Sequence, residues 1–233
     1  MSQIACDFFG FSTADGPTNM ARDDALAVYA AAVGRPALRF YDWSEPTLSL
    51  GYFQRAAHRI PGLPFVRRPT GGGAIVHDHD LTYALALPIA VAKATERPWP
   101  CRVHDAIRAA LAGFGVDGLV CAATEFGRGA FLCFEHVTPG DVLIGKGKVV
   151  GSAQRKRDRG VLIHGSVLLA ASPSAPHLPG LAELTDFKFS VASLVGAFLQ
   201  CLGNDTGWRI ARAAPPLAAD TTAYASDDWN LKR

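Results

Sequence analysis

Residues 37–87, ALRFYDWSEPTLSLGYFQRAAHRIPGLPFVRRPTGGGAIVHDHDLTYALAL, consist of short apolar runs separated by glycine- and proline-rich breaks. The runs cover residues 37–41, 47–52, 65–68, 74–77 and 82–87. Runs of this length bounded by turn residues predict β-strands, and the connections are too short for the crossovers that parallel neighbours require. This stretch therefore predicts a mainly antiparallel sheet.

The same pattern returns between residues 131 and 169. Here we expect a strand from Phe131 to His136, then strands over 142–144, 149–154 and 161–169, separated by turns at Thr138-Pro139-Gly140 and Gly145-Lys146-Gly147. Because the outer strands of this meander would each carry one inward-facing residue, Cys133 and Lys148 are expected to approach the same pocket.

Helical periodicity predicts three helices. The first is capped by Thr18 and ends at Gly34, and its expected buried face is Ala25, Val28, Tyr29, Ala32 and Val33. The second carries Val103, Ile107, Ala110, Leu111 and Phe114 on one stripe, and the third follows Ser190 and runs to Gly203 with Val191, Leu194, Val195, Phe198, Leu199 and Leu202 on one stripe. The fold class is therefore α+β, with helices covering a mainly antiparallel sheet, and residues 1–233 are expected to form a single domain.

Composition excludes several classes of protein. With 49% hydrophobic and 19% charged residues and a net charge of +2, the chain lacks the composition of a disordered protein and the overall charge of a nucleic-acid binder. It has no apolar run of about 18 residues and no secretory signal, so we expect a cytoplasmic protein that does not act in a membrane. Its five cysteines are scattered without a CxxC pair, which indicates neither a disulfide framework nor a structural zinc site.

The glycine loop Arg67-Arg68-Pro69-Thr70-Gly71-Gly72-Gly73 is the strongest local signal for a binding site. Three glycines leave backbone N–H groups open to an anion or a carbonyl oxygen, although a flexible hairpin would have the same composition. The spacing fits neither a phosphate loop nor a dinucleotide fingerprint. His77 is expected to close this loop by hydrogen bonding, because HDHD at residues 77–80 matches no defined metal-ligand pattern.

Cys133 and Lys148 are the candidate catalytic pair. Taken alone, Cys133 among aromatic residues is typical of an inert small hydrophobe, and Lys148 of a surface lysine at a turn. If the two side chains meet, however, the cation favours the thiolate, which is the nucleophilic form of cysteine. The same lysine could then orient an acyl group.

These residues together resemble the lipoate-protein ligase and octanoyltransferase family, which shares its fold with the biotin protein ligases. The matching segments, in order, are Pro17–Ala21, Arg39–Tyr41 with Trp43, Ser49–Gln54, Arg67–Gly73, Leu81–Tyr83, Lys148–Gln154 and His164–Ser166. The ending Tyr224–Arg233 resembles the end of the LipM-type octanoyltransferases. The resemblance covers nearly the whole chain and implies the catalytic-domain fold of that family, without a separate accessory domain.

The resemblance implies acyl transfer onto a lysine of a lipoyl domain. In the LipM-type enzymes the nucleophile is a cysteine followed by phenylalanine, the place that Cys133 and Phe134 hold here, and Lys148 holds the place of the family lysine. The residues implied to bind substrate are Arg68, Thr70, Gly71, Gly72, Gly73, His77, Gly151, Ser152, Ala153, Gln154, His164 and Gly165. An octanoyl group would pass from acyl carrier protein to Cys133 and then to the acceptor, without ATP or a metal ion.

Two departures from the LipM pattern keep alternatives open. Gly73 stands where many LipM-type sequences have arginine, a form more common in the ligases, and the section after the third helix is short for a LipM-type enzyme. The alternatives are an ATP- and Mg-dependent lipoate ligase that forms lipoyl adenylate, an amidotransferase between lipoyl proteins, and a non-catalytic acyl-binding module.

The expected partners are octanoyl-acyl carrier protein and a lipoyl-domain acceptor, either glycine cleavage H protein or an E2 subunit of a 2-oxoacid dehydrogenase. We expect no nucleic-acid partner and a monomer. The run Arg155-Lys156-Arg157-Asp158-Arg159 is either a solvated turn or a docking patch for an acidic partner.

Overall fold

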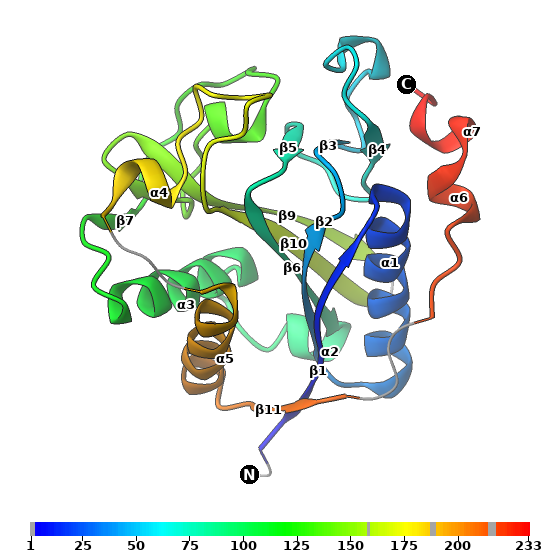
Figure 1. Ribbon diagram of the computed structural model, residues 1–233. Coiled ribbons are helices and arrows are strands. Elements are labelled where there is room, and N and C mark those ends of the chain that lie inside the picture. Colours follow the sequence, from blue (N-terminus) through cyan, green and yellow to red (C-terminus); the bar gives the residue numbers. More distant parts are fainter. Residues whose placement is uncertain (1–2, 158, 187–189, 214–217) are drawn as a thin grey trace.

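The computed structural model describes residues 3–157, 159–186, 190–213 and 218–233 (Figure 1). Its large sheet has eight strands in the order β11-β1-β2-β6-β10-β9-β8-β7, and a small sheet has the order β4-β3-β5. The strands of the large sheet are β1 (Ala5–Ala14), β2 (Ala37–Trp43), β6 (Asp80–Pro88), β7 (Leu119–Cys121), β8 (Val142–Ile144), β9 (Gly147–Arg157), β10 (Gly160–Leu168) and β11 (Arg209–Arg212). Those of the small sheet are β3 (Thr47–Leu50), β4 (Phe65–Arg67) and β5 (Ile75–His77).

Most strand pairs are antiparallel, which confirms the predicted fold class. Only β1 in the large sheet, beside β2 and β11, and the pair β3 and β4 in the small sheet are parallel among the described strands. The segment quoted from residues 37–87 does not form one sheet, because β2 and β6 join the large sheet while β3, β4 and β5 form the small one.

The helices lie on both faces of the large sheet (Figure 1). They are α1 (Gly16–Val33), α2 (Ile89–Ala92), α3 (Trp99–Gly113), α4 (Leu181–Leu184), α5 (Val191–Thr206), α6 (Thr222–Ala225) and α7 (Asp227–Asn230), with 3₁₀ turns at Ala56–His58 and Cys133–Glu135. None of the described helices is long and apolar enough to cross a membrane.

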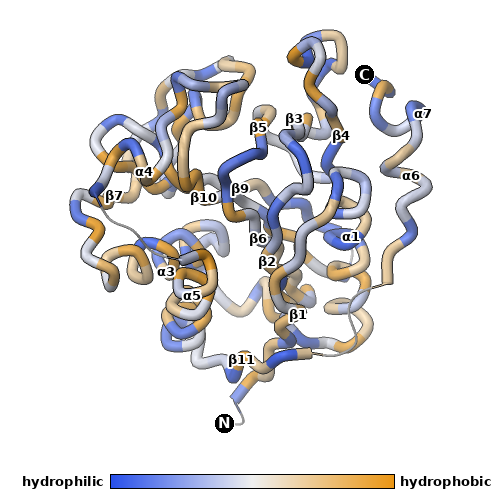
Figure 2. Tube along the Cα trace, viewed as in Figure 1, coloured by the Kyte–Doolittle hydropathy of each residue, from blue (hydrophilic) through white to orange (hydrophobic). Residues whose placement is uncertain are grey.

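Successive side chains of β6 point to opposite faces of the large sheet, which explains why helices pack on both faces. Leu81, Tyr83 and Leu85 point to the core shared with α3 and α5, whereas Ala84 and Ala86 point to the core shared with α1. Small alanines let α1 approach the sheet closely, while the larger residues fill the space under α3 and α5. In Figure 2, α3 and α5 accordingly alternate between hydrophobic and hydrophilic segments.

The predictions for α3 and α5 are confirmed, with one shift. Helix α5 passes Gly203 and ends at Gly207, whose φ of 70° gives the left-handed cap. A glycine on the helix surface does not itself end a helix, because the cap needs the left-handed conformation.

The prediction for α1 is wrong in its cap and in its buried face. Asp15, whose carboxylate accepts from Thr18 N, is the cap, while Val28 is 63% exposed and Val33 is 42% exposed. The buried face instead carries Asn19, Asp23 and the apolar residues around them. A search for apolar residues at helical spacing misses this face, because Asn19 and Asp23 are polar and their burial is made possible by hydrogen bonds.

The basic run is not one turn. Arg155, Lys156 and Arg157 are the last residues of β9, and Asp158 lies outside the described residues. Arg157 pairs with Asp24 of α1 at 2.6 Å, whereas Arg155 donates to the carbonyl of Pro69 at 2.9 Å. The run therefore divides between two parts of the surface.

Candidate functional site

Cys133 lies at the start of a 3₁₀ turn, so the predicted strand from Phe131 to His136 is wrong. The segment pairs with the end of the glycine loop only briefly: Ala74 N donates to Phe131 O at 2.9 Å and Cys133 N to Ala74 O at 2.7 Å. Glu135 then accepts from Leu132 N at 3.3 Å and closes the turn. The alternation of apolar residues suggested a strand, but this side-chain cap bends the chain after one bridge.

Lys148, the second residue of β9, meets Cys133 across the site. Its Nζ lies 3.7 Å from Cys133 Sγ and donates to the carbonyls of Cys133 at 3.1 Å and of His136 at 2.9 Å. Asp141 Oδ2 is 2.8 Å from the same nitrogen, and both side chains of this ion pair are more than 95% buried. The ammonium is therefore fixed in position with its charge balanced, and a thiol lies beside it.

Asp141 was missed by the sequence analysis. It follows the turn Thr138-Pro139-Gly140, and its carboxylate also accepts from the amide and hydroxyl of Thr138, at 2.8 and 3.0 Å. A buried charge needs a partner, so the burial of Lys148 required an acid close by. Nothing in the sequence distinguished Asp141 from an ordinary turn residue.

Two glycines leave the space in which Cys133 and Lys148 meet. A Cβ at Gly151 would lie 2.5 Å from Lys148 Cε, and one at Gly73 would lie 2.9 Å from Cys133 N. Real Cβ atoms do not approach other atoms so closely, so both positions require glycine for this arrangement.

Arg68 holds the glycine loop in place. Its guanidinium donates to the carbonyls of Gly71 at 2.8 Å, Gly73 at 2.6 Å and Ser49 at 2.9 Å. Burial lowers the pKa of Arg68 to about 10, so the side chain is still a cation at neutral pH. Within the described part of the chain, the N–H groups of Gly72 and Gly73 donate to no residue, which leaves them able to bind an oxygen of a substrate.

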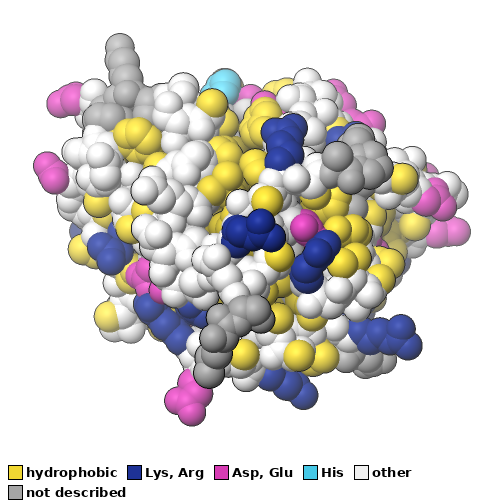
Figure 3. Space-filling view, turned by 90° about the horizontal axis from the view of Figure 1, so that it is seen from below, with side chains coloured by type: hydrophobic (Ala, Val, Ile, Leu, Met, Phe, Trp, Pro, Cys, Tyr) yellow, Lys and Arg dark blue, Asp and Glu magenta, His cyan; other side chains and the backbone are white. Residues whose placement is uncertain are grey.

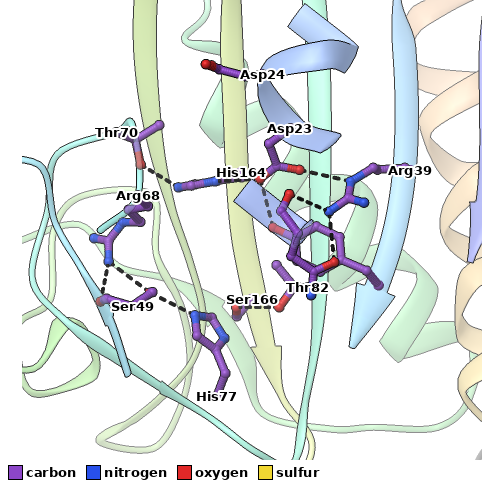
Figure 4. A network of polar contacts seen from close by, with 12 residues as sticks. Asp23, Asp24, Arg39, Ser49, Arg68, Thr70, His77, Thr82, His164 and Ser166 are labelled. Atoms are coloured by element: carbon purple, nitrogen blue, oxygen red, sulfur yellow. Dashed lines mark hydrogen bonds and ion pairs between the residues drawn. The ribbon is translucent and has the colours of Figure 1, made fainter. Parts of the chain in front are cut away.

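A second polar network runs from the glycine loop to α1 (Figure 4). The Thr70 hydroxyl hydrogen-bonds His164 Nε2, and His164 Nδ1 donates to Asp23 at 3.1 Å. Burial lowers the pKa of His164, which matches a neutral ring that accepts at Nε2 and donates at Nδ1. Burial alone would raise the pKa of Asp23, but its ion pair with Arg39 at 2.9 Å and its other hydrogen bonds lower it. This network fixes the loop against the sheet.

His77 bonds Ser49 and Asp80 rather than the glycine loop, which it was expected to close. Its Nε2 is 2.8 Å from Ser49 Oγ and its Nδ1 is 2.9 Å from Asp80 Oδ2, while its ring stacks on Trp43 with centroids 4.0 Å apart. Asp80 accepts from Thr82, and together these bonds lower its pKa against the effect of burial. Ser49 and Asp80 were not predicted as site residues, although Ser49 begins the matching segment Ser49–Gln54 and Asp80 ends HDHD.

A narrow cavity of only about 10 Å³ lies between these networks. It is lined by Met20, Tyr41, Trp43, Ser49, Arg68, Ile75, His77, Thr82, His164, Gly165 and Ser166. Four of the residues implied to bind substrate, Arg68, His77, His164 and Gly165, line it directly. Its walls combine apolar and aromatic side chains with a few fixed polar groups, as ligand sites commonly do.

The other residues implied to bind substrate do not line this cavity, and they differ in how close to it they lie. A Cβ built on Gly72 would lie 3.8 Å from the Cβ of Ala153, so the glycine loop passes over β9 at Ala153. The Ser152 hydroxyl bonds Tyr83 and His104, the latter at 2.5 Å, and so joins the site to α3. Gln154 has an exposed side chain and does not line the cavity.

No cluster of three or more His, Cys, Asp or Glu residues suited to a metal ion occurs in the described ranges. Asp80 and His77 bond each other, and Asp78 bonds Ser172 at 2.9 Å. The acidic and histidine residues of HDHD therefore serve different local contacts.

Comparison with known proteins places this geometry in context. Residues 15–182 match the family model of the lipoyl protein ligase A/B catalytic domain. The octanoyltransferase LipM of Kyrpidia tusciae is 36% identical over 264 residues, which cover 92% of this chain and 94% of that protein. LipM of Symbiobacterium thermophilum is 36% identical over 85% of this chain and 79% of its own length, and LipM of Carboxydothermus hydrogenoformans is 34% identical over 70% of this chain and 64% of its own length.

Among solved structures, similar folds occur in lipoate-protein ligases. A bi-partite lipoate protein ligase from Thermoplasma acidophilum has a TM-score of 0.76 at 18% identity, covering 98% of this chain and 96% of that one. Lipoate-protein ligase A bound with ATP has a TM-score of 0.76 at 19% identity, covering 98% and 99%. At these identities the similarity concerns the fold.

Proposed function

The chain belongs to the lipoyl protein ligase A/B catalytic-domain family, and we propose that it transfers an octanoyl group to a lipoyl-domain lysine through a thioester on Cys133. The similarity to LipM octanoyltransferases over most of both chains supports the reaction class. The observation that carries the mechanism is the Lys148 ammonium, held 3.7 Å from Cys133 Sγ by Asp141 and two carbonyl groups.

In the first step, the Cys133 thiolate attacks the carbonyl carbon of the octanoyl thioester on acyl carrier protein. A carbon–sulfur bond to Cys133 forms as the one to the carrier breaks, the carrier thiolate takes up the proton that Cys133 had released, and the octanoyl group stays on Cys133. Lys148 stabilises the negative charge on sulfur before attack. Lys148 and the free N–H groups of Gly72 and Gly73 then stabilise the charge on the carbonyl oxygen.

In the second step, the amine of the acceptor lysine attacks the Cys133 thioester. An amide bond forms as the carbon–sulfur bond to Cys133 breaks, and the proton lost by the amine restores the Cys133 thiol. Because exchange between thioesters is nearly balanced and conversion of a thioester to an amide is downhill, neither ATP nor a metal ion is required.

The cavity lined by Trp43, His77 and Gly165 is the proposed site of the octanoyl chain, and it must widen to admit the chain because its volume is only about 10 Å³. Burying about seven methylene and methyl groups contributes roughly 5 kcal/mol at about 0.8 kcal/mol per group. This energy comes from apolar contact, so selection of chain length needs few polar groups.

The proposal extends to the setting of the reaction. The acceptor is a lipoyl-domain protein such as glycine cleavage H protein or an E2 subunit, the protein acts in the cytoplasm, and residues 1–233 form a single catalytic domain that acts as a monomer.

The test is lipoyl-domain octanoylation from octanoyl-acyl carrier protein without ATP. Cys133→Ala is expected to lose essentially all activity, whereas Cys121→Ala, which removes an exposed thiol on β7, keeps it. Modification that appears only with ATP and free acid, and that Cys133→Ala leaves intact, would instead identify an ATP-dependent ligase.

A further inference from the structure

A group of aromatic and basic residues, some exposed and some half-buried, lies at the edge of the site and takes no part in the steps above. We call it the mouth surface and define it by Tyr52, Phe53, Arg155, Lys232 and Arg233. Phe53 is 70% exposed, and Lys232 Nζ lies 3.9 Å from the Tyr52 ring centroid. Arg155 and Arg233 approach the same ring, at 5.2 and 5.5 Å.

The mouth surface brings together three segments that are distant in sequence. Arg155 comes from β9, the aromatic pair follows β3, and the two remaining cations follow α7. Ala56 N donates to Arg233 O at 2.8 Å, which joins the aromatic segment to the end of the chain. Tyr52 N donates to Thr70 O at 2.8 Å, next to Pro69, whose carbonyl accepts from the Arg155 side chain at 2.9 Å.

The mouth surface is connected directly to the candidate site. The Phe53 ring lies over Gly71 of the glycine loop, 3.7 Å from an ideal Cβ there. The next residue, Gln54, donates to the carbonyl of Phe131 at 2.9 Å, two residues before Cys133. A molecule that binds Phe53 therefore lies beside the glycine loop and the nucleophile segment.

The charges of this surface are not neutralised by the protein. Among the described residues, no Asp or Glu forms an ion pair with Arg155, Lys232 or Arg233, although Asp227 and Asp228 lie on the neighbouring α7. The Lys232 ammonium and then the two guanidinium groups lower the pKa of Tyr52, as expected beside uncompensated positive charge. Cations beside an exposed aromatic side chain such as Phe53 are typical of a surface that binds an acidic partner with an apolar contact at its centre.

We propose that the mouth surface docks the acidic carrier protein that delivers the acyl thioester, an inference that rests on the proposed function. The donor is favoured over the acceptor for two reasons. A carrier presents its acyl group on an arm that contains a phosphodiester, so it brings an anion as well as an acidic protein surface to these cations. The acceptor presents a lysine, whose positive charge these cations repel.

The opposite end of the molecule provides a matched control. Figure 3 shows that end, where Lys and Arg side chains lie among apolar, neutral and acidic ones. Lys93, which follows α2, and Arg209 of β11 are exposed there. Reversing both charges changes the net charge as much as reversing Lys232 and Arg233 does.

The experiment compares Lys232→Glu/Arg233→Glu with Lys93→Glu/Arg209→Glu, at low and at high salt. Two donors are used for Cys133 octanoylation: octanoyl-acyl carrier protein and S-octanoyl-N-acetylcysteamine, a small thioester without a protein surface. Arg155 is left unchanged because its bond to Pro69 also holds the glycine loop.

At low salt, the mouth variant is expected to raise the KM for the carrier donor by about tenfold or more, with a smaller difference at high salt. Its reaction with the small thioester, and both reactions of the control variant, should match the parent. An unchanged carrier KM, an equal loss with the small thioester, or a raised KM for the lipoyl domain alone would each overturn the proposal.

Direct binding of the carrier to the protein separates this test from the proposed function. If the unaltered protein forms no Cys133 adduct with either donor, the thioester mechanism is wrong. Salt-sensitive carrier binding that is lost only in the mouth variant would still support docking at this surface, and binding equal in both variants would contradict it.

Discussion

Gly151→Ala tests whether the position of the Lys148 ammonium is what activates Cys133. The added Cβ would lie 2.5 Å from Lys148 Cε and 3.0 Å from Nζ. Because nonbonded carbon atoms prefer about 3.5 Å or more, the end of the lysine side chain must move by roughly 1 Å. It can do so only by leaving its present place 3.7 Å from Cys133 Sγ and 2.8 Å from Asp141.

A displacement of about 1 Å in a catalytic group costs on the order of 100-fold in rate. We therefore expect Cys133 octanoylation in Gly151→Ala to slow by about that factor. The free energy of unfolding should fall by only about 1–3 kcal/mol, because the overpacked atom is the end of a flexible side chain.

Gly196→Ala is the control, since a Cβ there meets no atom within 4 Å and the residue lies on the exposed face of α5. It should leave the rate unchanged and stabilise the helix by about 0.5–1 kcal/mol. The assay is the rate of octanoyl adduct formation from a small thioester, followed by intact mass, together with urea unfolding. A folded Gly151→Ala protein that reacts at the parental rate would refute the reasoning.

Three further outcomes follow from the buried polar groups. Asp141→Asn leaves Lys148 buried without its counter-ion, so urea unfolding should show a loss of about 3–5 kcal/mol, and a loss below about 1 kcal/mol would contradict the ion pair. Arg68→Lys cannot bridge the carbonyls of Ser49, Gly71 and Gly73 at once, so proteolysis within the loop should become faster, and an unchanged cleavage rate would count against its bracing role. Burial lowers the pKa of His104 and of His164, so as the pH falls these two histidines are protonated in the unfolded state before they are protonated in the folded state. The free energy of unfolding should therefore fall as the pH drops below about 6.5, by up to about 1.4 kcal/mol per pH unit for each ring. Unfolding curves at pH 5–8 check this, and His104→Gln should reduce the slope.

The sequence predicts most of the framework because the apolar pattern of β6, α3 and α5 matches their surroundings directly. Helix α1 departs from that pattern, since its buried face includes Asn19 and Asp23, which are held by hydrogen bonds to distant strands. Strand β1 (Ala5–Ala14) was not predicted, and its parallel pairing with β11 (Arg209–Arg212) joins segments far apart in the sequence, a relation that no local pattern expresses.

The candidate site, like the fold, was predicted only in part from the sequence. The glycine loop stands out by composition, whereas Cys133 and Lys148 were selected by the expected meander and by the family resemblance. The structure brings the two side chains together although Cys133 lies on a turn rather than on a strand. Asp141 and Ser49 look ordinary in the sequence because their importance arises only from what is buried beside them. The exposed side chain of Gln154 shows the reverse, a residue in a matching motif that lies outside the cavity.

Locating the octanoyl group on the protein tests the proposed mechanism most directly. The protein is incubated with octanoyl-acyl carrier protein in the absence of ATP, and its mass is recorded before and after hydroxylamine, with peptide mapping of the adduct. A single hydroxylamine-labile octanoyl group on Cys133, which is transferred to a lipoyl domain on addition, is the predicted result. An unmodified Cys133 under conditions in which the lipoyl domain is octanoylated would contradict the thioester relay.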